Sequence, residues 1–80
     1  MDRKKILLVD EEEAIRKMVR AILGSEFYEF DEAVNGLAAQ ALLDQQKFDL
    51  IITDVIMPDC DGIELVMAVR RKLPDIKVIV

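Results

Sequence analysis

The sequence predicts an α/β protein in which a parallel sheet carries helices on both faces. Short apolar runs rich in β-favouring residues alternate along the chain with longer segments whose apolar residues recur at helical spacing. The resulting order is strand-helix-strand-helix-strand-helix-strand, for which parallel strands joined by right-handed crossovers are expected. With 80 residues, the chain holds at most one domain.

Four segments are predicted to be strands. Residues 4–10 (KKILLVD) and 48–54 (FDLIITD) predict buried strands, because each is a short apolar run bounded by charge. Residues 27–36 (FYEFDEAVNG) give a weaker pattern, a half-buried strand followed by an Asn35-Gly36 turn. Residues 76–80 (IKVIV) predict the start of a fourth strand.

Three segments are predicted to be helices. Residues 11–24 (EEEAIRKMVRAILG) open with acids, which the helix dipole favours, and end at Gly24, a plausible stop. Residues 37–46 (LAAQALLDQQ) are strong helix formers, and residues 63–73 (IELVMAVRRKL) have apolar positions near helical spacing. The apolar stripe of the first helix consists of Ile15, Met18, Val19, Ile22 and Leu23.

The composition limits the function classes. The chain is 52% hydrophobic and 34% charged, as in a folded globular protein, and its net charge of −5 argues against binding nucleic acid or anionic membrane. It has no apolar run of the length a membrane span needs, and the run 6–9 is too short for the core of a signal peptide. Cys60 is the only cysteine and histidine is absent, which argues against a disulfide framework and zinc. We therefore expect a cytoplasmic protein.

Acidic residues follow two of the predicted strands. Asp10 and Glu11 come at the end of the first, and Asp54 comes at the end of the third. Parallel strands end at one edge of a sheet, so these carboxylates converge if the two strands are neighbours. Mg²⁺ relieves the mutual repulsion of a few carboxylates and also accommodates a phosphate. A carboxylate such as Asp54 is also a possible nucleophile toward phosphorus.

Each of these residues also has a simpler interpretation. The acids at 10–13 fit the charges of a helix N-terminus, and Asp54 fits a residue that caps a turn. Asp61 fits the N-cap of the third helix, and Asp31 and Glu32 fit solvated surface charges. The joint placement of acids at two separate strand ends favours a cation site, with Pro58 and Gly62 shaping the loop after Asp54.

Three stretches resemble the response-regulator receiver domain of two-component signalling. They are ILLVDEEEAIR, EAVNGLAAQALL and DLIITDVIMPDCDGIEL, and the resemblance runs from about Lys4 to Val80. It implies a flavodoxin-like fold with strand order 2-1-3-4-5. It also implies that Asp54 accepts a phosphoryl group from a histidine kinase or phosphotransfer protein. The implied Mg²⁺ ligands are Asp10, Glu11, Asp54 and the backbone carbonyl of Ile56.

The sequence departs from the receiver pattern in two ways. Glu11 is one methylene longer than the commoner Asp, so it is expected to reach the metal differently or through water. The chain also stops within the fourth strand, so the fifth strand, helices four and five, and the family's later Ser/Thr and Lys are absent. Bared sheet faces and an unprotected apolar edge predict a homo-oligomer formed by self-association. Slowed phosphoryl transfer is expected without the lysine.

Two main functional hypotheses follow. The first is a phosphoacceptor signalling module that is not an enzyme beyond weak self-catalysed phosphorylation and dephosphorylation. The second is a fragment that acts only as an assembly piece. A haloacid-dehalogenase-type phosphatase is disfavoured, because Ile56 stands where a second acid is needed. A nucleotide-binding module is disfavoured because the sequence has no Gly-rich phosphate loop.

Overall fold

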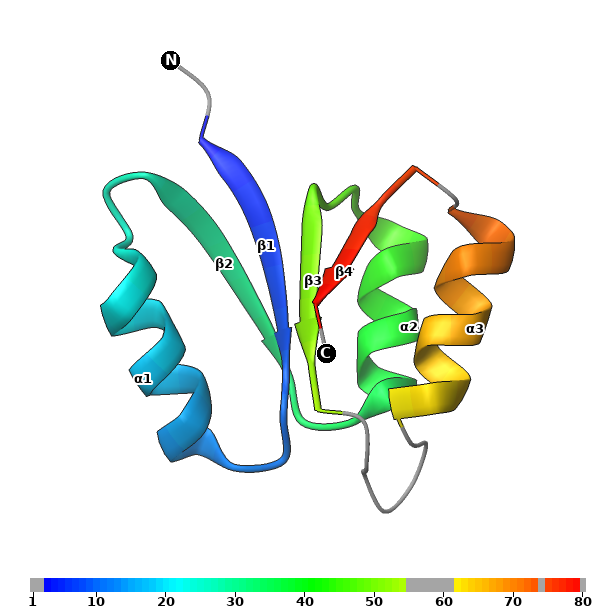
Figure 1. Ribbon diagram of the computed structural model, residues 1–80, viewed down its shortest axis with the longest axis horizontal. Helices are drawn as coiled ribbons and strands as arrows, with labels where there is room; N and C mark the ends of the chain where they lie inside the picture. The colour runs from blue at the N-terminus through cyan, green and yellow to red at the C-terminus, as the bar shows by residue number, and fades with distance from the viewer. Residues whose placement is uncertain (1–2, 55–61, 74, 80) are drawn as a thin grey trace.

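The fold is a four-stranded parallel sheet in the order β2-β1-β3-β4, with one helix after each of the first three strands (Figure 1). The computed structural model describes residues 3–54, 62–73 and 75–79. The strands are β1 (Lys4–Val9), β2 (Tyr28–Ala33), β3 (Leu50–Thr53) and β4 (Lys77–Ile79), and the helices are α1 (Glu13–Leu23), α2 (Gly36–Gln45) and α3 (Gly62–Lys72). The predicted order of elements is confirmed.

The helices lie on both faces of the sheet. Figure 1 shows α1 on one face, and α2 and α3 side by side on the other. The predicted fold class, with a parallel flavodoxin-like sheet between helices, is therefore confirmed. No helix among the described residues is long and apolar enough to cross a membrane.

The buried core lies between the sheet and the pair α2 and α3. β1 runs through the middle of the sheet, and its last four residues are all buried, as expected for a central parallel strand. A buried hydrophobic cluster joins β1, β3 and the end of β2 to α2 and α3. Its members are Leu7, Val9, Ala33, Ala39, Phe48, Ile51, Leu65 and Val69.

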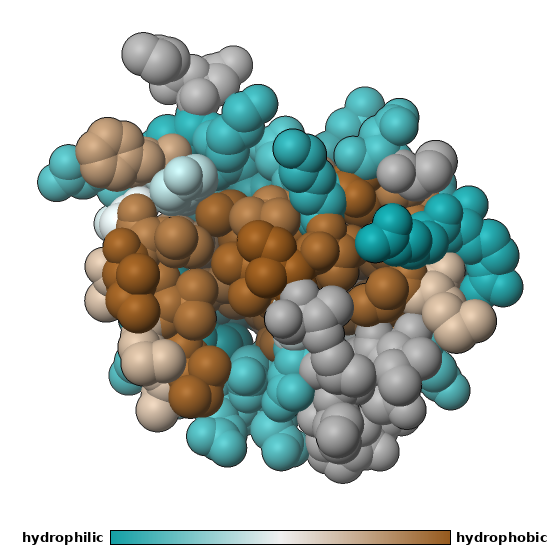
Figure 2. Space-filling model, in the orientation of Figure 1, coloured by the Kyte–Doolittle hydropathy of each residue, from teal (hydrophilic) through white to brown (hydrophobic). Residues whose placement is uncertain are grey.

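The opposite face of the sheet is covered less completely. No residue of α1 is buried, and two members of the predicted apolar stripe, Met18 and Ile22, are 51% and 74% exposed. Figure 2 shows a hydrophobic region running from α1 across the middle of the molecule. A single helix cannot cover a four-stranded sheet, so the apolar side of α1 stays partly in water.

Helix boundaries follow local chemistry. α1 begins at Glu13, two residues later than predicted, and ends at Leu23. Gly24 is its C-cap, as predicted, and the φ of 86° there suits glycine. The Gly24 N–H donates to the Arg20 carbonyl at 2.9 Å. Asn35 is the N-cap of α2, where its side-chain oxygen accepts from the Ala38 N–H at 2.8 Å. The predicted Asn35-Gly36 turn is thus the start of a helix.

Candidate functional site

The carboxyl ends of β1 and β3 meet at one edge of the sheet. The two strands pair in parallel with Val9 opposite Thr53, and each strand is followed directly by an aspartate. The Asp54 N–H donates to the Val9 carbonyl at 3.1 Å, which joins Asp54 to the residue just before Asp10. On the other side, the Asp10 N–H donates to the Ala33 carbonyl at 3.1 Å. Backbone pairing therefore fixes Asp10 between the ends of β2 and β3.

Asp10 is half-buried and engaged in local hydrogen bonds. Its Oδ1 accepts from the Glu12 N–H at 2.9 Å, which turns the chain into α1. Its carbonyl accepts from Arg16 Nη1 at 2.6 Å. Glu11, between the strand and the helix, is exposed. Asp10 thus has a defined backbone and one carboxylate oxygen already used by the protein.

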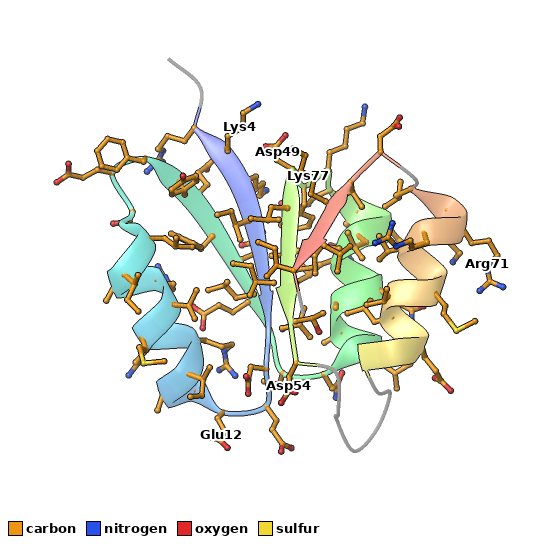
Figure 3. All side chains as sticks on the ribbon, viewed as in Figure 1. Lys4, Glu12, Asp49, Asp54, Arg71 and Lys77 are labelled. Atoms are coloured by element: carbon orange, nitrogen blue, oxygen red, sulfur yellow. The ribbon has the colours of Figure 1, made fainter. Side chains whose placement is uncertain are left out.

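Asp54 is more open than Asp10. It is exposed, whereas the neighbouring Thr53 is only 3% exposed and donates from Oγ1 to the Asp54 carbonyl at 3.0 Å. Asp54 and Asp10 line the same pocket of about 240 Å³, whose other walls come from Thr53 and from apolar residues of β1, β3 and α1. Figure 3 shows Asp54 and Glu12 at one end of the sheet, opposite Lys4 and Lys77. Of the two aspartates in this pocket, Asp54 is therefore the one more accessible to a partner.

An ion-pair cluster lies beside this edge. Glu32 near the end of β2 accepts from Arg16 Nε at 2.8 Å and from Arg20 Nη1 at 2.5 Å. Burial by itself raises the pKa of Glu32, but the hydrogen bonds and charges of Arg16 and Arg20 together outweigh burial and lower this pKa below its ordinary value of 4.5. The cluster links β2 to α1 and, through the second hydrogen bond of Arg16, to Asp10.

The prediction that Asp31 and Glu32 are solvated surface charges holds only in part, because their side chains are 36% and 25% exposed but each is ion-paired. Asp31 Oδ2 lies 3.6 Å from Lys5 Nζ, and Glu32 is held by two arginines because β2 lies next to both β1 and α1. Sequence reasoning missed Arg16 as a residue of the site. The available signal was the spacing of Arg16 and Arg20, which places both on one side of a helix.

The predicted metal ligands have different outcomes. The structure brings Asp10 and Asp54 to one pocket, while Glu11 is exposed in the connection to α1. Across residues 3–54, 62–73 and 75–79, no three acidic or thiol side chains are grouped closely enough to hold a metal ion. The carbonyl of Ile56, the predicted fourth ligand, lies outside the described residues, as do Pro58 and Asp61. The full ligand set therefore stays a prediction.

Comparison with known sequences identifies the family. The family model for the response regulator receiver domain matches residues 6–80. The transcriptional regulatory protein ResD of Bacillus subtilis is 46% identical over 68 residues, covering 85% of this chain and 28% of ResD. The chemotaxis protein CheY of Halobacterium salinarum is 40% identical over 68 residues, covering 85% of this chain and 57% of CheY. The chain thus spans less than two thirds of these relatives.

Solved structures give the same result. The response regulator TrrA of Thermotoga maritima, in complex with Mg²⁺-BeF, superposes with a TM-score of 0.87 and is 39% identical over 94% of this chain and 65% of TrrA. The same regulator in complex with the histidine kinase ThkA gives a TM-score of 0.85 at 39% identity, with the same coverage of both chains. With a family model matching nearly its whole length, the chain belongs to the response regulator receiver domain family.

Proposed function

We propose that the chain is a phosphoacceptor module of two-component signalling, in which Asp54 receives a phosphoryl group from a histidine kinase or phosphotransfer protein. The observation that carries this proposal is the exposed carboxylate of Asp54 beside the half-buried Asp10, at the carboxyl ends of neighbouring strands. The similar regulator TrrA forms a complex with the histidine kinase ThkA, which supports a partner of this kind. The net charge of −5 favours a protein partner over nucleic acid.

The proposed step is a displacement at phosphorus. An oxygen of the Asp54 carboxylate forms a bond to phosphorus, and the bond from phosphorus to the imidazole nitrogen of the kinase histidine breaks. The leaving nitrogen keeps the bonding electron pair and takes up a proton from water. Asp54 suits the nucleophile because it is exposed, whereas Asp10 is half-buried.

The donor set at this edge fits a magnesium ion. Two carboxylates at one pocket supply oxygen ligands, and Mg²⁺ commonly uses one or two carboxylates and keeps several waters. Asp10, Asp54, Glu11 and the carbonyl of Ile56 would hold the ion. When bound, Mg²⁺ offsets the negative charge of the transferring phosphoryl oxygens. The Mg²⁺-BeF complex of TrrA supports this assignment.

The proposed role is a signal carrier and not a turnover enzyme. Within the described residues, the site offers a nucleophile and metal ligands, and Asp54 returns to its free form when water hydrolyses the acyl phosphate. Any self-catalysed phosphorylation or dephosphorylation is expected to be weak. The family match favours this signalling role over a role in assembly alone.

Intact mass spectrometry tests the proposal. The chain is incubated with Mg²⁺ and a small-molecule phosphodonor, alongside Asp54→Asn and the matched control Asp44→Asn, which removes an exposed acid on α2. One added phosphoryl group is expected on the parent and on Asp44→Asn, and none on Asp54→Asn. A parent chain that is folded and stays unlabelled, or label that persists on Asp54→Asn, would contradict the assignment.

A further inference from the structure

The guanidinium group of Arg16 makes two directed contacts with different partners. Its Nε donates to Glu32 Oε1 at 2.8 Å, and its Nη1 donates to the Asp10 carbonyl at 2.6 Å. The Arg16 side chain is only 11% exposed and that of Glu32 is 25% exposed, so water screens the contacts weakly. Glu32 therefore fixes the fork of Arg16 in the orientation that reaches Asp10.

Arg16 completes the set of bonds around Asp10. The Asp10 N–H is tied to the Ala33 carbonyl, its Oδ1 to the Glu12 N–H and its carbonyl to Arg16. Neither of the first two bonds acts on the Asp10 carbonyl, which belongs to the peptide plane between Asp10 and Glu11. The third bond, charge-assisted and short, fixes that plane and with it the direction in which Glu11 leaves the strand.

We propose that Arg16 is a positioning residue, which sets the backbone of Asp10 and Glu11 for binding a divalent cation. The inference rests on the proposed function, since that function places the cation at these acids. Residues that orient metal ligands from behind typically change metal affinity by about 10- to 100-fold when they are replaced. Arg16 acts on the backbone from outside the ligand set, so a smaller loss of Mg²⁺ affinity, about 5- to 20-fold, is expected.

Arg20 provides a matched control on the same helix. It binds the other oxygen of Glu32 at 2.5 Å, is 45% exposed, and has no contact with Asp10 among the hydrogen bonds found in the described residues. Replacing Arg20 removes a similar ion pair with Glu32 but leaves the bond to Asp10. A purely structural role for the cluster predicts a loss of unfolding free energy in both variants with Mg²⁺ affinity of the folded chain unchanged. A positioning role predicts that Mg²⁺ affinity of the folded chain falls for the Arg16 replacement alone.

The test compares Arg16→Gln, Arg16→Lys and Arg20→Gln in the 80-residue chain. Mg²⁺ is titrated while the backbone amide resonances of Asp10 and Glu11 are followed, and urea unfolding establishes the folded fraction. Arg16→Gln should weaken Mg²⁺ binding by about 5- to 20-fold, and Arg20→Gln by less than twofold. Arg16→Lys keeps a charge for Glu32 but lacks the planar fork, so an intermediate loss is expected. If Arg16→Gln does not fold, Arg16→Lys carries the comparison.

The outcomes separate this inference from the proposed function. Mg²⁺ binding by folded Arg16→Gln within twofold of the parent, or equal weakening by Arg20→Gln, would overturn the positioning role. If the parent itself binds no Mg²⁺ at these amides, the proposed metal site fails. The positioning role is then decided without metal, by hydrogen exchange of the Glu11 and Glu12 amides. Faster exchange in Arg16→Gln alone supports it, and unchanged exchange overturns it.

Discussion

Replacement of Ile51 and Ile52 by alanine, one at a time, compares the two faces of the sheet at neighbouring positions of β3. Alternation along a strand directs the two side chains to opposite faces. Ile51 is fully buried in the core beside α2 and α3, and lies between Leu7 and Val78 of the flanking strands. Ile52 is half-buried and lines the pocket on the α1 face.

The expected losses follow from this difference in burial. Each replacement removes three carbon groups, which at about 0.8 kcal/mol each amounts to about 2.4 kcal/mol of transfer free energy for a fully buried side chain. The enclosed position of Ile51 adds a cavity cost, for a total of about 3–4 kcal/mol. Ile52→Ala should lower the unfolding free energy by about 1–2 kcal/mol, because the pocket that Ile52 lines is open to water. The change in strand propensity is similar for both and largely cancels in the comparison.

Urea unfolding followed by far-ultraviolet circular dichroism measures both losses. With a slope of about 1 kcal/mol per molar urea for a chain of this size, the two midpoints should differ by about 2 M. If Ile51→Ala leaves no folded baseline, the milder replacements are compared instead. Ile51→Val should then lower the unfolding free energy by about 1 kcal/mol, and Ile52→Val by less than about 0.5 kcal/mol. Equal losses at the two positions would refute the unequal coverage of the sheet, once sedimentation shows that both variants have the same association state at the concentration used.

Three further predictions concern charge, helix capping and association. Because the folded pKa of Glu32 is lowered, its pairs with Arg16 and Arg20 stabilise the fold above pH about 4.5, and this stabilisation is lost as pH falls through the folded pKa. The difference in unfolding free energy between the parent and Glu32→Gln should therefore shrink in acid. A difference that does not depend on pH would count against this prediction. Asn35→Ala should cost about 1 kcal/mol in urea unfolding by removing the cap of α2, whereas Asn35→Asp should retain most of the stability, and equal losses would contradict the cap. The outer side of β4 has no neighbouring strand among the described residues, and the α1 face is apolar, so the 80-residue chain should self-associate at tens of micromolar; a clean monomer in equilibrium sedimentation would argue against this.

The local hydrophobic pattern was sufficient to predict most of the strands and helices, because it reflects the preference of each segment for strand or helix. The apolar runs ending at Asp10 and Asp54 predicted β1 and β3, and the parallel order placed both acids at one edge. The beginning of α1 was less predictable. Four consecutive acids from 10 to 13 all suit a helix N-terminus. The structure places the helix start at Glu13, because Glu12 has extended backbone and its carbonyl accepts from the Arg16 N–H at 3.3 Å.

The sequence by itself determined the order of elements, the fold class and the pair Asp10 and Asp54, since strand ends and periodicity are written along the chain. Only the tertiary structure decided the contacts between residues far apart in sequence. The pairing of Arg16 with Glu32 needs β2 to lie beside β1 with α1 next to it, and nothing local to either residue encodes that arrangement. The exposure of Met18 and Ile22 has the same origin. An apolar stripe shows which side of a helix can be buried, and only the packing of the whole fold determines what fraction of that side is buried.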